Sequence, residues 1–229
     1  MQLEILELQS NMRQMIPGSQ NTSSSFPMPN ELVDTISQFY KCDFEDLFFD
    51  LLGTELSVEG LVYFFKNSIP KLIRCIQGYF ESAEDRLREV ACIGDLEGPI
   101  MNVLRKSYQN NWKEIFKRCL SEEDVNGITR EIQATLRIGE ASCSTNEVLN
   151  AFFMRFSEIL FCLHINDPPF RCMDQFIGQR VEFNSLLHDA IDGFIRTGDN
   201  CFIILPQILK STGESVLRAG VLRTDYELS

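Results

Sequence analysis

Apolar residues recur every three or four positions along much of the chain, which is the period of an amphipathic helix. The longest such stretch covers residues 62–87, and its polar face alternates acidic and basic side chains, as a solvated helix face does. Pro70 lies inside this stretch and predicts a kink. Further helices are predicted over residues 32–40, 44–52, 100–116 and 125–136. The pattern therefore predicts a mainly helical protein.

Two short polar motifs mark expected helix starts. Ser121 with Asp124 resembles a capping box, in which side chains accept hydrogen bonds from the N–H groups of the first turn. Ser144 with Glu147 resembles a second, ahead of a helix over residues 148–165. Because that helix is apolar on nearly every face, it is predicted to lie at the centre of a helical bundle.

The pattern changes after residue 165. Asp167, Pro168 and Pro169 form a turn that cannot continue the helix, and we expect this turn to be structural. Short β-branched and apolar runs over residues 181–183, 201–205 and 216–222 predict strands, with Pro206 at a strand end or edge. Residues 185–191 predict a short helix. The expected fold class is α+β, a mostly helical bundle with a small C-terminal β-sheet.

The first thirty residues are expected to stand apart from this domain. Residues 1–16 carry apolar side chains in heptad register and predict a short coiled-coil-like helix, too short to be stable alone. Residues 17–30 are rich in Ser and Pro and predict a linker. Residues 31–229 are predicted to form the one main domain.

Composition narrows the classes of function. The formal net charge of −12 argues against nucleic acid as a partner, because such binding depends on Lys and Arg displacing counterions. Acid is densest over residues 31–59, where eight carboxylates face a single Lys41. Such a run is usually a solvated helix face, and the alternative is a surface that docks a basic partner. No apolar run approaches the ~18 residues of a membrane span, and no leader pattern is present, so a soluble cytosolic protein is expected.

Basic residues nevertheless gather in one region. Five of them form a candidate membrane or partner contact, because they could share one side of the bundle: Arg105, Lys106, Lys113, Lys117 and Arg118. The acidic excess of the whole chain makes repulsion from anionic lipid the default, so any direct lipid binding by the chain alone is expected to be weak.

The cysteines and histidines predict no cofactor or metal site. The eight cysteines are widely spaced, no CxxC pair occurs, and the two histidines lack zinc-ligand spacing. We therefore interpret them as reduced, mostly buried thiols. The one candidate for chemistry combines Cys201, His188 and Asp189 as a thiol site, but no local catalytic motif supports it. No catalytic, cofactor-binding or metal-ligating residue is assigned.

The C-terminal part carries a succession of features that together resemble a known family. The Phe- and Leu-rich helix over residues 152–165 leads into Asp167, Pro168 and Pro169, followed by Gly178, by Phe183 with Asn184, by a hydrophobic strand ending at Pro206, and by a last strand over residues 216–221. This succession resembles the C-terminal domain of the mitochondria-eating protein family, over about residues 31–224. Leu205 stands where that family usually has an aromatic residue.

The resemblance implies a non-enzymatic role in mitochondrial quality control. It implies a cytoplasmic protein recruited to damaged mitochondria, at the outer membrane or in the matrix, that promotes their repair or removal. The partners it implies are outer-membrane proteins and mitochondrial lipid such as cardiolipin, and self-association stays open. Two alternatives come from the residues themselves: an adaptor whose acidic face docks a basic protein, and a thiol-dependent hydrolase using Cys201 and His188.

Overall fold

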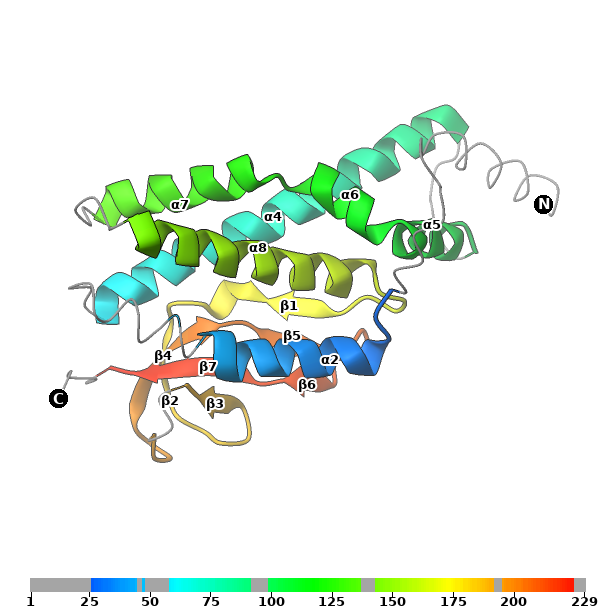
Figure 1. The fold of residues 1–229 in the computed structure, drawn as a ribbon. Coiled ribbons are helices and arrows are strands. Elements are labelled where there is room, and N and C mark those ends of the chain that lie inside the picture. Colours follow the sequence, from blue (N-terminus) through cyan, green and yellow to red (C-terminus); the bar gives the residue numbers. More distant parts are fainter. Residues whose placement is uncertain are drawn as a thin grey trace.

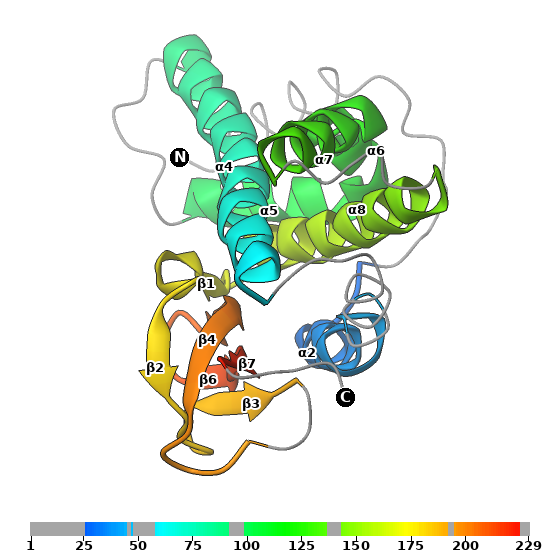
Figure 2. The same cartoon turned by 90° about the vertical axis from the view of Figure 1, so that its left-hand side faces the viewer.

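The computed structural model describes residues 26–44, 47, 58–91, 99–136, 143–191 and 195–224. The predicted helix over residues 1–16, most of the linker and residues 48–52 lie outside this described part. Within it, helices form one layer and short strands form a second layer beneath them, with α2 beside the strands (Figure 1, Figure 2). The α+β prediction is confirmed.

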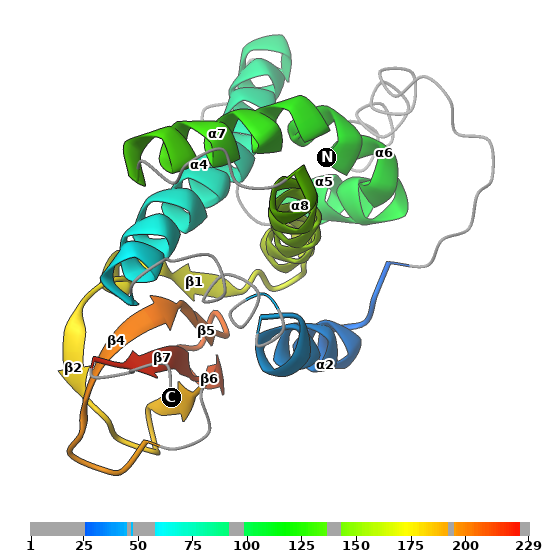
Figure 3. The same ribbon diagram turned by 60° about the vertical axis from the view of Figure 1, so that its left-hand side comes forward.

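The helical layer is built around α8 (Cys143–Ile165). The other helices of this layer are α4 (Val58–Ala91), α5 (Pro99–Asn110), α6 (Trp112–Cys119) and α7 (Glu122–Leu136). Figure 3 looks nearly along α8 and shows it between α4 on one side and α5 and α6 on the other. Phe153, Phe156 and Phe161 of α8 are fully buried, so the predicted central position is confirmed.

The segment before this layer joins the helices to the strands. Helix α2 (Pro29–Gln38) continues into the π-helical turn η1 (Phe39–Asp43). Phe39 stacks on Phe156 with ring centroids 5.3 Å apart. The buried Tyr40 hydroxyl donates to the carbonyl oxygen of Pro206 at 2.8 Å, and the Asp43 carboxylate lies 2.8 Å from the guanidinium of Arg155. This segment therefore contacts both layers.

The strands form two sheets instead of the single sheet predicted. The first contains β1 (Arg171–Met173), β5 (Gln207–Leu209) and β6 (Ser215–Leu217), in the order β1-β5-β6. The second contains β2 (Arg180–Glu182), β3 (His188–Ala190), β4 (Asn200–Leu205) and β7 (Ala219–Arg223), in the order β2-β4-β7-β3. Strand β3 is parallel to β7, and the other pairs are antiparallel.

One long hairpin belongs to both sheets. Its strands bend at Pro206 and at Arg218, where β4 gives way to β5 and β6 to β7, and register shifts lie on either side of the bend. Bends and bulges of this kind let a strand pass from one sheet to another. The prediction of one strand over residues 216–222 was wrong for this reason, whereas Pro206 does stand at a strand end as predicted.

Residues 185–191 do not form the predicted short helix. The Asn184 side chain accepts from the N–H of Leu186 at 2.9 Å, and its backbone carbonyl accepts from the N–H of Leu187 and of His188. Asn side chains compete with helix formation in this way. The chain then enters β3, which pairs with β7, so a tertiary partner determines the conformation.

Several helix boundaries were predicted, and two were wrong. The Ser121–Asp124 capping box is present, with Ser121 N–H donating to the Asp124 carboxylate at 2.9 Å. The predicted helix over residues 100–116 is interrupted at Asn111, which separates α5 from α6. Helix α8 begins at Cys143, before Ser144, so Ser144 is not its N-cap. Pro70 lies within α4 without ending it.

The buried side chains form two clusters. The larger lies between the helices and one side of the strands, and includes Phe64, Phe65 and the phenylalanines of α8. The smaller contains Cys201, Ile203 and Val221 of the four-stranded sheet, covered by Phe183 and Ile195. The four-stranded sheet is therefore covered on both faces.

Candidate functional site: the basic surface of α5 and α6

Helices α5 and α6 carry a local excess of positive charge in an acidic chain. Residues 99–120 contain five Lys or Arg side chains and one acid, Glu114, whereas the whole chain has a formal charge of −12. Four of the five basic residues are exposed, and we call them the α5–α6 basic surface: Lys106, Lys113, Lys117 and Arg118. This surface was part of the candidate contact predicted from the sequence.

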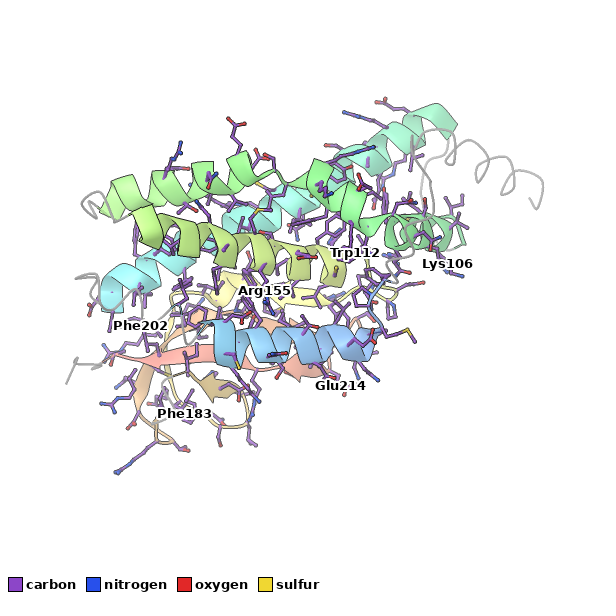
Figure 4. All side chains as sticks on the ribbon, in the orientation of Figure 1. Lys106, Trp112, Arg155, Phe183, Phe202 and Glu214 are labelled. Carbon is purple, nitrogen blue, oxygen red and sulfur yellow. The ribbon has the colours of Figure 1, made fainter. Side chains whose placement is uncertain are left out.

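Helix α6 carries three of these residues on its exposed side, and its opposite side packs against the core. Trp112, Ile115 and Phe116 face the core, and Lys113 and Lys117 are one turn apart on the exposed side. Trp112 packs edge-on against Phe26 with ring centroids 6.4 Å apart. The burial of its apolar face fixes how α6 presents its basic side chains. Figure 4 shows Lys106 and Trp112 at the part of the molecule away from Phe183 and Phe202.

The charges of this surface are largely uncompensated. Lys117 lies 3.7 Å from the Glu114 carboxylate, and both side chains are well exposed, so this pair is weak. Lys113 Nζ lies 5.4 Å from the centroid of the Trp112 ring, within cation–π range. Within the described residues, Lys106, Lys113 and Arg118 make no ion pair. The surface can therefore attract an anionic partner.

Arg105, the fifth predicted contact residue, is placed differently. Its guanidinium lies 3.6 Å from the carboxylate of Asp167, and both side chains are partly buried. On the same helix, the Gln109 side chain donates to the carbonyl of Ile165 at 3.1 Å. The structure thus brings Arg105 together with the predicted turn, and not with the exposed lysines.

The turn itself lies at the join between α8 and the strands. The Asp167–Pro168 peptide is cis, and the Asn166 side chain donates to the carbonyl of Pro168 at 2.9 Å. Phe170 N–H donates to the carbonyl of Leu163. This hydrogen bond holds the residue before β1 against the last turn of α8. Asp167 therefore contacts α5 and Pro168 contacts the end of α8, and the structural role of the turn formed by Asp167, Pro168 and Pro169 stays a prediction.

A buried imidazole lies close to this join. His164 stacks on Phe80 with ring centroids 4.7 Å apart. Burial, together with the nearby charge of Arg105, lowers the pKa of His164 to about 4. The imidazole is therefore neutral at physiological pH and acts as a packing residue.

The thiol site considered from the sequence is not assembled. Cys201 is fully buried in the smaller core cluster, and His188 lies on β3, with β7 between β3 and β4. Cys201 pairs with Arg223, whereas His188 pairs with Ala219. Two strand spacings, about 10 Å, and four residue steps, about 13 Å, therefore separate the two positions. A thiol and an imidazole so placed cannot exchange a proton directly. Asp189 instead pairs with Arg218 at 2.6 Å.

The alternative site, an acidic surface over residues 31–59 that docks a basic protein, lies only partly within the described residues. Glu31, Asp34 and Glu59 are exposed, and Asp43 is engaged by Arg155. The remaining carboxylates of the run, Glu45, Asp46, Asp50 and Glu55, lie outside the described residues.

Sequence reasoning missed one conspicuous surface feature. Leu186 and Leu187 are 82% and 53% exposed in the turn before β3. The sequence predicts a helix over residues 185–191, and two adjacent leucines in such a helix suggest a buried face. Their exposure was therefore not expected. A signal that could have found them is the Asn184 side chain, which is typical of a turn.

No family model, curated protein or solved structure gives a significant match to the chain. The resemblance to the mitochondria-eating protein family therefore stays a prediction. No helix in the described part of the chain combines the length and apolar character needed to cross a membrane. Among the same residues, no group of three or more His, Cys, Asp or Glu side chains is arranged to hold a metal ion.

Proposed function

We propose that the protein is a non-enzymatic binding and assembly module in mitochondrial quality control, recruited from the cytoplasm to damaged mitochondria. The sequence resemblance over about residues 31–224 supports the organelle. The α5–α6 basic surface supports binding to an anionic partner, and this is the observation that carries the proposal. Four exposed basic side chains lie on two consecutive helices, with one acid between them, in a chain whose formal charge is −12.

The partner we propose for this surface is the anionic face of a mitochondrion. Its chemistry is that of lipid phosphate, as in cardiolipin, or of acidic stretches on outer-membrane proteins. Each basic residue near an anionic membrane contributes about 1 kcal/mol. Four of them give about 4 kcal/mol, which corresponds to a dissociation constant near 1 mM. Binding by a single copy is therefore weak, and several linked copies would be needed for firm attachment.

Flotation with liposomes tests the lipid arm of this proposal. We expect weak, salt-sensitive binding to vesicles containing cardiolipin, and none to vesicles of neutral lipid. The triple variant Lys113→Glu, Lys117→Glu and Arg118→Glu should abolish it. A matched control with the same change of charge, Arg180→Glu, Arg196→Glu and Lys210→Glu, alters exposed residues of the strand layer and should retain binding. Equal loss in both variants would show that only net charge matters.

A cellular experiment tests recruitment. We expect a tagged full-length chain to move from the cytoplasm to mitochondria after mitochondrial damage, and the triple variant on α6 to stay behind. If the variant is recruited as well as the parent, the α5–α6 basic surface is not needed for recruitment. Recruitment together with failure to bind liposomes would instead favour a protein partner at the outer membrane.

A further inference from the structure

Arg105 and Asp167 form an ion pair without a hydrogen bond. Arg105 Nη1 lies 3.6 Å from Asp167 Oδ1, beyond hydrogen-bond distance, and the two side chains are 25% and 33% exposed. Within the described residues, neither side chain makes a hydrogen bond to any other group. The charge of Arg105 also reaches Glu84 of α4, but Glu84 forms its ion pair with Arg88. The N–H donors of the Arg105 guanidinium therefore remain available to a stronger acceptor.

Other contacts fix the backbone on both sides of this ion pair. On α5, the Gln109 side chain donates to the carbonyl of Ile165 at 3.1 Å. In the turn, the Asn166 side chain donates to the carbonyl of Pro168 at 2.9 Å. An ion pair between partly exposed side chains contributes little to stability. The Arg105 side chain can therefore change its partner while α5 and the turn stay in place.

Arg105 lies next to the α5–α6 basic surface on the same helix. Asn102 is exposed and precedes Arg105 by three residues and Lys106 by four. Residues three and four apart are neighbours on a helix surface, so Asn102 adjoins both basic side chains. Lys106 belongs to the basic surface and makes no ion pair within the described residues. An anion above Asn102 is therefore placed between the two cations.

We propose that Asp167 is an intramolecular competitor that holds Arg105 away from the α5–α6 basic surface until lipid phosphate displaces it. This inference rests on the proposed function, because it describes how binding at that surface is restrained. Phosphate oxygens accept two parallel hydrogen bonds from a guanidinium, whereas Asp167 accepts none from Arg105. Binding thus brings a fifth basic residue to the surface, and Asp167 keeps the affinity below what five basic residues would give.

Flotation over a range of concentrations of cardiolipin-containing vesicles tests this restraint. Asp167→Asn should tighten binding about fivefold, the contribution of one more basic residue near an anionic surface. The matched control is Glu182→Gln on β2, which makes the same change of charge at an exposed position and should bind like the parent. In a chain that carries Arg105→Gln, the further change Asp167→Asn should give no gain.

Chemical modification of the parent tests the same exchange without a substitution. It keeps the test decisive if thermal melts show that Asp167→Asn does not fold. Phenylglyoxal modifies guanidinium groups, and peptide mass spectrometry identifies the arginines that have reacted. Vesicles containing cardiolipin should protect Arg105 and leave the exposed Arg180 as reactive as before. Vesicles of neutral lipid should protect neither.

The outcomes separate this inference from the proposed function. If the parent binds the vesicles and Asp167→Asn binds no more tightly, the inference is overturned and the proposed function stands. A gain that persists without Arg105 also overturns the inference, because the change of net charge then explains it. Unprotected Arg105 in vesicle-bound parent has the same meaning. If neither the parent nor Asp167→Asn binds the vesicles, the inference is overturned together with the lipid arm of the proposed function.

Discussion

Gly220 illustrates how closely the strands pack at the level of single residues. A Cβ atom built there would lie 2.9 Å from Leu205 Cβ and 2.9 Å from Ile191 Cδ1. Leu205 Cβ is attached directly to the backbone of β4, so it cannot move aside without moving the strand. The glycine is therefore required by the close approach of β4 and β7.

We predict that Gly220→Ala destabilises the protein by about 1 to 3 kcal/mol, the usual cost of overpacking. Gly127→Ala is the matched control, because nothing lies within 4 Å of a Cβ at that position on α7. It should stabilise by roughly 0.5 to 1 kcal/mol through helix propensity. Urea denaturation measures both changes, and a neutral Gly220→Ala would mean that β4 and β7 are less tightly packed than described.

The cysteines allow burial to be tested residue by residue. Cys42 and Cys75 are exposed, whereas Cys162 and Cys201 are buried. Burial raises the pKa of Cys162 to about 12 and raises that of Cys75 to a smaller extent. A thiol reacts through its thiolate, so exposure and pKa together determine the rate.

We predict that alkylation of the native protein at neutral pH modifies Cys42 first, then Cys75, and leaves Cys162 and Cys201 unmodified. Peptide mass spectrometry after a timed reaction gives the order. The urea-denatured chain serves as the control, in which all four thiols should react. Rapid modification of native Cys201 would revive the thiol-enzyme alternative.

Among the elements, α8 and α4 contribute the largest numbers of buried apolar residues to the core. Phe156 is fully buried and stacks on Phe39 and on Phe152. Phe156→Ala should therefore cost about 3 to 5 kcal/mol through lost burial and a residual cavity. Gln77→Ala, at an exposed position of α4, should stay within about 0.5 kcal/mol of the parent. Equal melting temperatures for the parent and Phe156→Ala would contradict the central position of α8.

The last turn of α8 also gives a dependence on pH. The pKa of His164 is lowered from 6.5 to about 4, mainly by burial and also by Arg105. The unfolded chain therefore binds this proton more readily than the folded chain does between these two values. Stability from the neutral imidazole is complete above about pH 6.5 and is lost as the pH falls toward 4.

We predict that His164→Phe reduces the decline in stability between pH 6.5 and pH 4, by an amount on the order of 3 kcal/mol at most. The difference between parent and variant is the quantity to measure, because carboxylates titrate in the same range. His188→Phe is a useful comparison, since the pKa of His188 is lowered in the same direction but its imidazole is more exposed. Parallel stability curves for the parent and His164→Phe would show that His164 is protonated without cost.

Elements that depend on local chemistry were predictable from the sequence, and those that depend on distant partners were not. The Ser121–Asp124 capping box and the long period of α4 follow from nearby residues. Strands β1 and β5 have only three residues each, too few for an alternating pattern to be recognised. The separation of β6 from β7 requires knowing that Arg218 lies beside the Pro206 break across the hairpin, since Leu205 pairs with Gly220 and Ile208 with Leu217.

The same distinction between local and distant partners applies to the candidate site. Lys113 and Lys117 are four residues apart, so their common face follows from helix geometry. Arg105 does not belong to that face because it pairs with Asp167, which is sixty-two positions further along the chain and could not be identified as its partner from the sequence. Asn184 indicates the turn that contains Leu186 and Leu187, but how exposed the two leucines are also depends on which strand borders that turn.

At the scale of the whole molecule, the order of strands in the second sheet differs from their order in the chain. Strand β7 follows β2, β3 and β4 in sequence yet lies between β4 and β3. As the chain leaves the ribosome, the helices up to Ile165 emerge first and can begin to pack against one another. Strand β3 then has no neighbour until residues 219–223 appear, some thirty positions later. During that interval both edges of β3 lack a partner strand, and unpaired strand edges of this kind expose a folding chain to pairing with other chains.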